Sequence, residues 1–281
     1  MSIIVTADSS CDLPKDALSP IPFELIPLTI IQNGVEYLDG VDITPEDIYR
    51  RVAQGEPVPT TSAVNVADYH ARFSALSHQH DAVIHISLGS GISSCYTHAK
   101  LAAEDFPNVY LVDSQNISVG SGLLVLEAKR LIEEGRNPKE IAGILTEMAK
   151  RVEFTFLIDQ LTYLHKGGRC SGIAALGANL LRLKPSIAVH EGGTLGMAKK
   201  YRGVMDKVLP QFLQDRLKDR SDIIAEKTLL VTTSCPAHWI TLSTDQLQQH
   251  TGLTSDILYY AGCTICSHSG PQALGLAVLK Q

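Results

Sequence analysis

The stretch "DAVIHISLGSGISSCY" (81–96) decides the fold, because it joins a buried strand to the start of a helix. Its first half is a short apolar run, which is typical of a parallel strand that is covered on both faces. Its second half, residues 90–96, holds three serines, a cysteine and a tyrosine. Three interpretations compete for these polar side chains: an anion site, a nucleophile and an ordinary helix cap.

The rest of the first half of the chain repeats this alternation of strand and helix. Thr44, Pro45 and Asp47 form the start signal of one helix, as N-cap, first helical residue and capping-box partner. Strands are expected at 3–7, 23–31 (with a break at Pro27), 81–88 and 108–114, and helices at 44–55, 65–76, 120–135 and 138–151. This rhythm predicts a parallel sheet covered by helices.

Beyond residue 158 the chain changes to glycine-rich turns and isolated strands. The pattern predicts a hairpin at 186–202 around Glu191-Gly192-Gly193, a helix at 203–219, strands at 227–234 and 256–262, and a last helix that the turn Gly270-Pro271 opens. We therefore expect an α/β fold of two domains. Residues 1–158 carry the parallel sheet, and residues 159–281 form a second α/β domain.

Composition and charge exclude several classes of protein. The 281 residues are 44% hydrophobic and 19% charged, as in a globular protein, and the net charge of −6 argues against a nucleic-acid-binding protein. The opening residues "MSIIVTADSS" have no basic region and only a short apolar run. We therefore expect no signal peptide and a cytoplasmic location.

One segment, residues 165–202, is strongly basic. It contains one acid, Glu191, and carries a net charge of +6, which leaves −12 for the rest of the chain. Its basic residues are Lys166, Arg169, Arg182, Lys184, Lys199, Lys200 and Arg202. These basic residues could simply form a solvent-exposed face whose ion-pair partners lie elsewhere in the chain. A docking face for a phosphate, an acidic protein or another anionic surface is the sharper interpretation.

The six cysteines are expected to be free thiols in a reducing compartment. Cys263, Cys266 and His268 form a C-x-x-C-x-H cluster that could begin a metal or redox site, but no second pair of ligands completes it. We therefore expect no metal, and metal or redox chemistry remains a third alternative.

The loop after the strand at 81–88 lacks the G-x-S-x-G spacing of an esterase, which argues against Ser90 and Ser93 as nucleophiles. Its Gly89–Ser94 segment matches G-x-G-x-x-S instead, and the next strand ends at Asp113, where a ribose-binding acid would lie. One alternative function is therefore a nucleotide- or phosphosugar-binding enzyme that uses this loop.

The helix-cap and anion interpretations of Ser93 and Ser94 are compatible, because a helix N-terminus offers free N–H groups and the positive end of its dipole. Two other segments place polar side chains in the same way. Residues 60–62 stand before the helix at 65–76, and His268 stands before the last expected helix. Three such segments favour one shared anion site.

Eight motifs follow one another along almost the whole chain. They are TADSSCDLP (6–14), TTSAVN (60–65), SGISSCYTHA (90–99), VDSQNISVGSGLLV (112–125), LTYLHKGGRCSG (161–172), LRLKP (181–185), KKYRG (199–203) and HSGPQALG (268–275). Together, over residues 3–279, they resemble the DegV family of bacterial fatty-acid-binding proteins. The chain differs from the family motifs at residues 63, 64, 94, 95 and 272.

The resemblance implies a two-domain α/β protein that holds one long-chain fatty acid between its domains and is not itself an enzyme. A separate ATP-dependent fatty-acid kinase phosphorylates the carboxyl group, and the acyl phosphate passes to phospholipid synthesis. By position, Thr61 and Ser93 would hold the carboxylate, with Ser62, Ser94 and His268 nearby.

The resemblance also places Arg169 and Arg202 in the face that meets the kinase or, transiently, the membrane surface. A neutral hydroxyl pair with helix N–H groups can bind a carboxylate without neutralising it, which leaves an oxygen nucleophilic. About fifteen buried methylenes would contribute on the order of 12 kcal/mol before ordering costs. Such a tail needs an aliphatic tunnel, and we expect residues 172–181 to form one wall.

Overall fold

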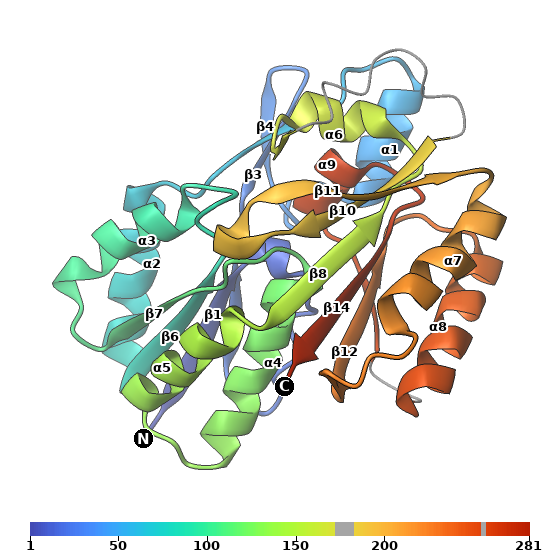
Figure 1. Ribbon diagram of the computed structural model, residues 1–281. Helices are drawn as coiled ribbons and strands as arrows, with labels where there is room; N and C mark the ends of the chain where they lie inside the picture. Colours follow the sequence, from blue (N-terminus) through green and yellow to red (C-terminus); the bar gives the residue numbers. More distant parts are fainter. Residues whose placement is uncertain (172–182, 254–256) are drawn as a thin grey trace.

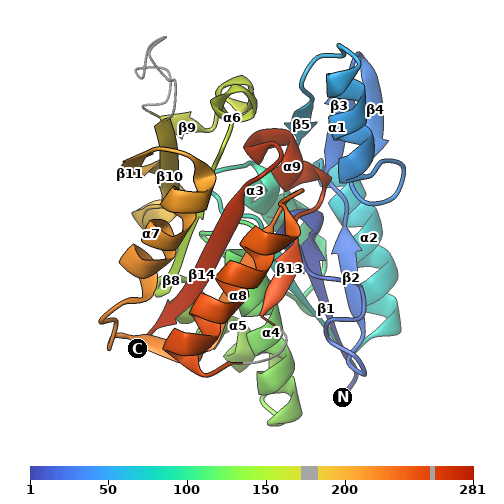
Figure 2. The ribbon, with the colours of Figure 1, turned by 90° about the vertical axis from the view of Figure 1, so that its right-hand side faces the viewer.

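The computed structural model of the chain describes residues 1–171, 183–253 and 257–281. Helices and sheets alternate in layers across the molecule (Figures 1 and 2). From left to right in Figure 1 these are α2 and α3, a parallel sheet, α4 and α5, a mixed sheet, and α7 and α8. The α-helices span Pro45–Ala53 (α1), Val66–Gln79 (α2), Cys95–Ala102 (α3), Val119–Glu133 (α4), Pro138–Ala149 (α5), Leu161–Gly167 (α6), Met205–Leu217 (α7), Ala237–Thr251 (α8) and Cys263–Ser269 (α9).

The first sheet is parallel, as the sequence pattern predicts. Its strands lie in the order β2-β1-β6-β7 and span Phe23–Ile26, Ile3–Asp8, Ala82–Ser87 and Val109–Asp113. All six residues of β6 are buried, because helices cover both faces of the sheet. Buried His85 in this strand lies with its Nδ1 3.0 Å from Thr6 Oγ1 of β1, which satisfies one polar group inside the sheet.

The second sheet contains seven strands of the described chain, in the order β13-β12-β14-β8-β10-β11-β9. They span Leu258–Tyr260, Ile223–Thr232, Leu274–Lys280, Val152–Leu157, Leu183–Val189, Leu195–Arg202 and Cys170–Ser171. One face packs on α7 and α8, and the other faces α4. The expected hairpin at 186–202 is present as β10 and β11, which a short 3-10 turn at Glu191–Gly193 connects.

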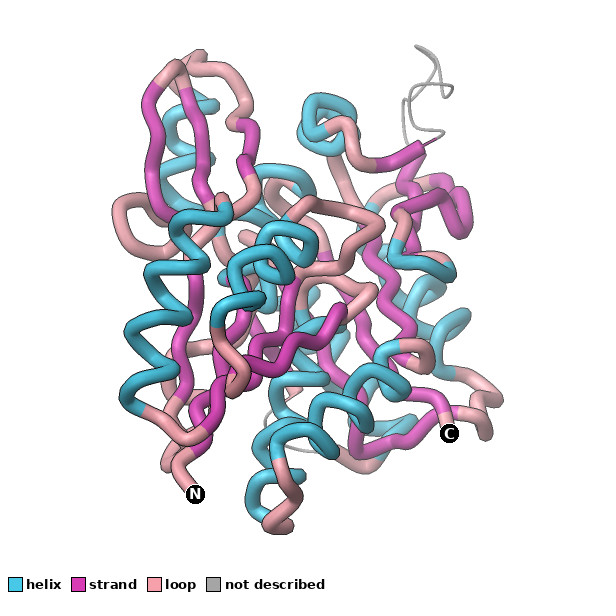
Figure 3. The backbone as a smooth tube through the Cα atoms, turned by 90° about the vertical axis from the view of Figure 1, so that its left-hand side faces the viewer, coloured by secondary structure: helices cyan, strands magenta, loops and turns pink. Residues whose placement is uncertain are grey.

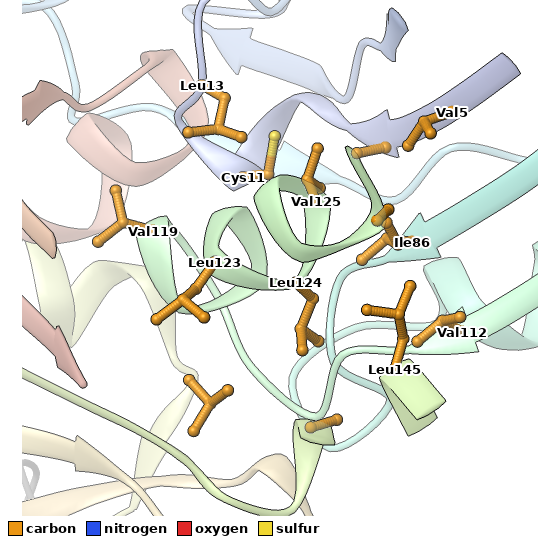
Figure 4. Packing of buried hydrophobic residues seen from close by; sticks show 14 of the residues in the cluster. Val5, Cys11, Leu13, Ile86, Val112, Val119, Leu123, Leu124, Val125 and Leu145 are labelled. Carbon is orange, nitrogen blue, oxygen red and sulfur yellow. The ribbon is translucent and has the colours of Figure 1, made fainter. Parts of the chain in front are cut away.

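Helix α4 is the link between the two sheets. One hydrophobic cluster contains Val5 and Ile86 of the parallel sheet, Leu124 of α4, and Phe154 and Val231 of the mixed sheet. Figure 4 shows how closely the side chains of α4 pack among those of the neighbouring elements. No helix among the described residues combines the length and the apolar character that crossing a bilayer requires.

A small antiparallel sheet completes the fold and carries the threonine segment. Its strands lie in the order β4-β3-β5 and span Val35–Leu38, Thr29–Gln32 and Thr60–Ser62. It stands at the upper end of the molecule beside α1 (Figures 1 and 3). The expected strand at 23–31 is thus two strands of different sheets, separated at Pro27. Helix α1 begins as predicted, because Thr44 and Asp47 form a complete capping box ahead of Pro45.

The prediction of a helix after Gly270-Pro271 is wrong. The helix precedes this turn as α9, Gly270 ends it at φ +70°, and the chain continues as β14. Alanine and leucine in this last segment have high helix propensity, but pairing with β8 and β12 on either side overrides it.

Two buried carboxylates from the first forty residues hold the start of α9. Asp39 Oδ1 accepts a hydrogen bond from Cys263 N (2.8 Å), and Asp39 Oδ2 accepts bonds from Thr264 N (3.2 Å) and Thr264 Oγ1 (2.6 Å). Asp12 Oδ1 accepts one from Gly262 N (2.8 Å). A carboxylate at this end also complements the helix dipole. Helix α9 therefore depends on partners far away in the sequence.

The domain boundary at residue 158 stays a prediction. Strand β8 lies before it, yet β8 pairs with β10 and β14 at the centre of the mixed sheet. The strand pairing therefore favours a boundary ahead of Val152. Helix α9 in turn packs on α1, β3 and β5, so the last part of the chain returns to the first domain.

We predict that Asp39→Asn lowers the free energy of unfolding by about 2–4 kcal/mol, because charge-assisted bonds to the start of α9 are lost and an amide N–H₂ faces buried donors. Urea unfolding followed by circular dichroism measures this change. Asp16→Asn, at an exposed site, is the control and should stay within about 0.5 kcal/mol of the parent. Equal stability of both variants would contradict the role of Asp39.

Candidate functional site

A cavity of about 730 Å³ lies where the carboxyl end of the parallel sheet meets the mixed sheet. Its wall includes the loops that follow β6 and β7, together with parts of β5, β8, β12, β14 and α9. Ligands of open α/β sheets bind at the carboxyl ends of the strands. All five residues expected around the carboxylate line this cavity: Thr61, Ser62, Ser93, Ser94 and His268.

Thr61 and His268 meet across this wall, although 207 residues separate them. Thr61 lies on β5, and its Oγ1 is 2.8 Å from His268 Nε2 of α9. His268 Nδ1 is buried and has no hydrogen-bond partner among the described residues. An added Cβ at Gly167 would lie 2.0 Å from His268 Nδ1, so only glycine lets α6 approach the ring this closely.

The partners of His268 indicate its tautomer. A buried N–H without an acceptor is less tolerable than a buried acceptor without a donor. We therefore assign the ring proton to Nε2, which donates it to Thr61 Oγ1. The hydroxyl proton of Thr61 is then free to be donated into the cavity.

Electrostatics keep His268 neutral. Burial lowers the pKa of His268 to about 4, and the positive charge of Arg169 acts in the same direction. The part of the cavity wall around His268 therefore carries the neutral hydroxyl groups of Thr61 and Ser93. The guanidinium of Arg169 also lines the cavity.

Ser93 lies just before α3 and serves the start of that helix. Its Oγ accepts a hydrogen bond from Cys95 N (3.3 Å) and donates one to Cys95 Sγ (3.2 Å). Ser94 is the N-cap residue but makes no side-chain cap bond, and it is exposed at the cavity rim. The cap and the cavity interpretations therefore both apply to Ser93. Ser62 is also exposed at the rim.

The Gly89–Ser94 loop is anchored by internal contacts. Asp113 Oδ2 accepts from Ser90 Oγ (2.6 Å), and Asp113 Oδ1 accepts from Ser90 N and Gln115 N (both 3.0 Å). Gly91 packs on the β10–β11 turn, where an added Cβ would lie 2.3 Å from Gly192 O. Asp113 thus acts as a loop anchor rather than as a free acid beside a ribose, and Ser90 donates to a carboxylate rather than to a histidine.

The C-x-x-C-x-H residues are occupied by other contacts. Cys263 Sγ donates to Ile43 O (3.2 Å) and Cys266 Sγ donates to Ala261 O (3.4 Å). Burial raises the pKa of the Cys263 thiol to about 12 and that of the Cys266 thiol well above its usual value. No group of three or more metal-ligating side chains occurs within residues 1–171, 183–253 and 257–281. These contacts do not favour metal or redox chemistry.

The two arginines expected in a docking face lie in different places. Arg169 lines the cavity, and its Nη1 donates to Gly167 O (2.8 Å). Arg202 is exposed at the end of β11 and is absent from the described cavity wall. The docking role of both stays a prediction, and Arg169 also has access to a ligand in the cavity.

Ion pairs account for part of the basic segment. Lys184 pairs with Asp159 (2.5 Å) and Lys199 with Asp215 (2.6 Å). Successive side chains of a strand point to opposite faces, so Lys200 and Arg202 lie on the face of β11 opposite Lys199. Arg182 and the expected tunnel wall at 172–181 lie outside the described residues.

The sequence pattern does not reveal the inner wall of the cavity. This wall consists of residues on or next to β8, β12 and β14 and of the loop before α4: Ile117, Ser118, Phe154, Phe156, Val231, Thr232, Thr233, Ala273 and Gly275. Most of these residues are apolar or small, and an apolar strand residue has no local feature that separates a cavity wall from a core. The mouth is therefore polar and the interior largely apolar.

The fold and the site define an α/β protein with an amphipathic cavity between two sheets. The model of the family described as "Uncharacterised protein, DegV family" matches residues 2–281, so this chain belongs to the DegV family. A DegV domain-containing protein of Caldanaerobacter subterraneus subsp. tengcongensis is 31% identical over 276 residues, which cover 98% of this chain and 97% of the relative.

Two solved structures share the fold over the full length of both chains. A fatty-acid-binding DegV family protein from Thermus thermophilus is 27% identical with a TM-score of 0.87 and 100% coverage of each chain. DegV, a fatty acid binding protein from Bacillus subtilis, is 26% identical with a TM-score of 0.81 and the same coverage. The expected resemblance and fold class are thereby confirmed.

We predict that His268 makes stability fall in acid. Its pKa of about 4 in the folded chain lies below the value of about 6.5 in an unfolded chain, so the unfolded state binds more protons between these values. The free energy of unfolding should therefore decrease as the pH drops through this window, by about 3 kcal/mol at most from this residue.

Urea unfolding of the parent and of His268→Gln, at about pH 7 and about pH 4.5, measures this contribution. The parent should lose more stability than the variant on acidification. The same loss in both proteins would show that His268 is not the group responsible.

Proposed function

We propose that this protein binds one long-chain fatty acid and presents its carboxylate to a separate ATP-dependent fatty-acid kinase, whose acyl phosphate product feeds phospholipid synthesis. The observation that carries the proposal is the polarity of the cavity described above. Its mouth holds the Thr61–His268 pair and Ser93, and its interior is largely apolar. The fatty-acid-binding relatives from Thermus thermophilus and Bacillus subtilis support the same ligand.

The head of the site suits a carboxylate that must still react. Thr61 can donate its hydroxyl proton, and Ser93 can donate its own by turning from the weak acceptor Cys95 Sγ to the carboxylate. Neutral donors hold the anion without protonating it. Thr61 and Ser93 have short side chains and lie next to the exposed rim residues Ser62 and Ser94. A phosphoryl donor can therefore approach the carboxylate from the solvent side. No nucleophile of the chain is required, which fits a carrier that is not an enzyme.

The interior of the site suits an acyl tail. Each buried methylene contributes about 0.8 kcal/mol, so about fifteen methylenes contribute on the order of 12 kcal/mol before ordering costs. Affinity therefore comes mainly from the tail, while the head fixes the orientation of the carboxylate. This division lets a head-group variant bind ligand and still fail as a substrate.

Kinase docking is assigned to the basic side of the molecule. Arg202 and Lys200 share one face of β11 and are exposed. Arg169, at the cavity mouth, lies where a phosphoryl donor would approach. Such a surface attracts an acidic or phosphate-bearing partner and also permits a transient contact with an anionic membrane surface.

We predict that Ser93→Ala weakens binding of palmitic acid by about ten- to a hundredfold, because one charge-assisted hydrogen bond is lost and the tail contacts remain. The double variant Ser93→Ala, Thr61→Ala should retain some bound acid but should not be phosphorylated, since transfer needs an oriented oxygen. Isothermal titration and a kinase assay measure the two effects. Thr60→Ala, exposed on the same strand and absent from the cavity wall, is the control.

Organic extraction followed by mass spectrometry tests the function itself. A fatty acid extracted from the purified protein supports the proposal, and a released nucleotide would support the enzyme alternative. A double variant that binds and is phosphorylated as well as the parent would show that Ser93 is only part of a helix cap.

We predict that Arg202→Ala keeps the affinity for palmitic acid within about twofold of the parent but lowers the rate of phosphorylation, because rim charges act mainly on association. Lys218→Ala, at an exposed site outside the basic segment, is the control. Loss of fatty-acid binding in Arg202→Ala would place this residue in the ligand site and end the docking assignment.

A further inference from the structure

The inner end of the cavity is closed by a row of side chains on the mixed sheet. Gly275 of β14 lies opposite Phe156 of β8 and Val231 of β12, and all three line the cavity. Ala277 follows Gly275 on the same face of β14 and pairs with Leu229 of β12. Neither Ala277 nor Leu229 is part of the described cavity wall. The cavity therefore ends between Gly275 and Ala277.

Phe154 occupies this end. Its backbone pairs with Ala277, which lies beyond the end of the cavity, yet its side chain lines the cavity. An added Cβ at Gly275 would lie 2.8 Å from both Cε2 and Cζ of Phe154. The ring of Phe154 thus lies over Gly275 rather than over Ala277, and only 3% of Phe154 is exposed.

Several neighbours fix the ring in this position. It stacks on Phe156, with ring centroids 5.7 Å apart and an angle of 28° between the planes. An added Cβ at Gly120 of α4 would lie 3.1 Å from Phe154 Cβ, and one at Gly275 would also lie 2.8 Å from Val231 Cγ1. Glycines on both sides therefore leave the space that this phenylalanine fills.

We propose that Phe154 sets the maximum length of the acyl chain, and that Gly275, which has no side chain, leaves the space that the ring of Phe154 occupies. This inference rests on the proposed function. A tail that reaches the ring can extend further only by displacing it into the packed core formed with α4, and overpacking of a core is unfavourable. A shorter side chain at 154 opens space for more methylenes, and a larger one at 275 pushes the ring into the cavity.

The two positions therefore predict shifts of opposite sign. Each methylene that gains or loses burial changes the affinity about fourfold. Phe154→Leu should raise the affinity for an acid two carbons longer than the parent's preferred ligand by on the order of tenfold, relative to that ligand. Gly275→Ala should shift the preference toward shorter acids by a similar factor.

Competition binding with the saturated even-numbered acids from myristic to arachidic acid measures these preferences. Phe212→Leu is the matched control, because Phe212 is equally buried but packs in the separate cluster beneath α7 and α8. It should leave the order of preference unchanged. Opposite shifts in the two cavity variants support the proposal, and Gly275→Ala alone decides it if Phe154→Leu does not fold.

The outcomes separate this inference from the function on which it rests. If the parent binds none of these acids, the fatty-acid function fails and the length limit fails with it. If the parent binds them and both cavity variants keep its order of preference, the function stands and the role of Phe154 is wrong.

Discussion

The site depends on a carboxylate that caps a helix from a distance. Asp39 and the first residues of α9 are 224 positions apart in the chain, and their hydrogen bonds fix where α9 begins. His268 lies in the last turn of that helix, and its ring reaches Thr61 of the small sheet. Without this cap, a seven-residue helix with two cysteines, two serines and one threonine would have little reason to form.

Helix α9 keeps two buried acids apart from the polar end of the cavity. Asp12 and Asp39 lie at the start of α9, while the polar side chains of the cavity mouth gather near its end. Burial raises the pKa of Asp12 well above its usual value, with the nearby charge of Asp39 as a smaller contribution. The two acids are therefore held within the scaffold by hydrogen bonds, and neutral hydroxyl groups face the cavity. A fatty-acid carboxylate would meet donors rather than competing anions.

Local signals in the sequence predict much of the fold, and distant contacts explain the errors. The capping box of Thr44 and Asp47 spans four residues, so α1 could be placed from the sequence alone. The cap of α9 could not, because Asp39 has no local relation to it. The sequence indicated the turn at Gly270-Pro271, but the residue type at 272 did not reveal that Gln272 stands in the left-handed region at φ +62°, where glycine is usual. The polar mouth of the cavity was found through motifs that carry polar side chains, whereas no expected strand contained Phe154, and Gly275 was expected in a helix.

A structure determined with palmitic acid bound tests the central claim most directly. We predict carboxylate oxygens within hydrogen-bonding distance of Thr61 Oγ1 and Ser93 Oγ, and a terminal methyl group against the ring of Phe154. A carboxylate held by Arg169 at the mouth, away from both hydroxyl groups, would contradict it. An acid bound with its tail at the mouth and its carboxylate in the interior would contradict it equally.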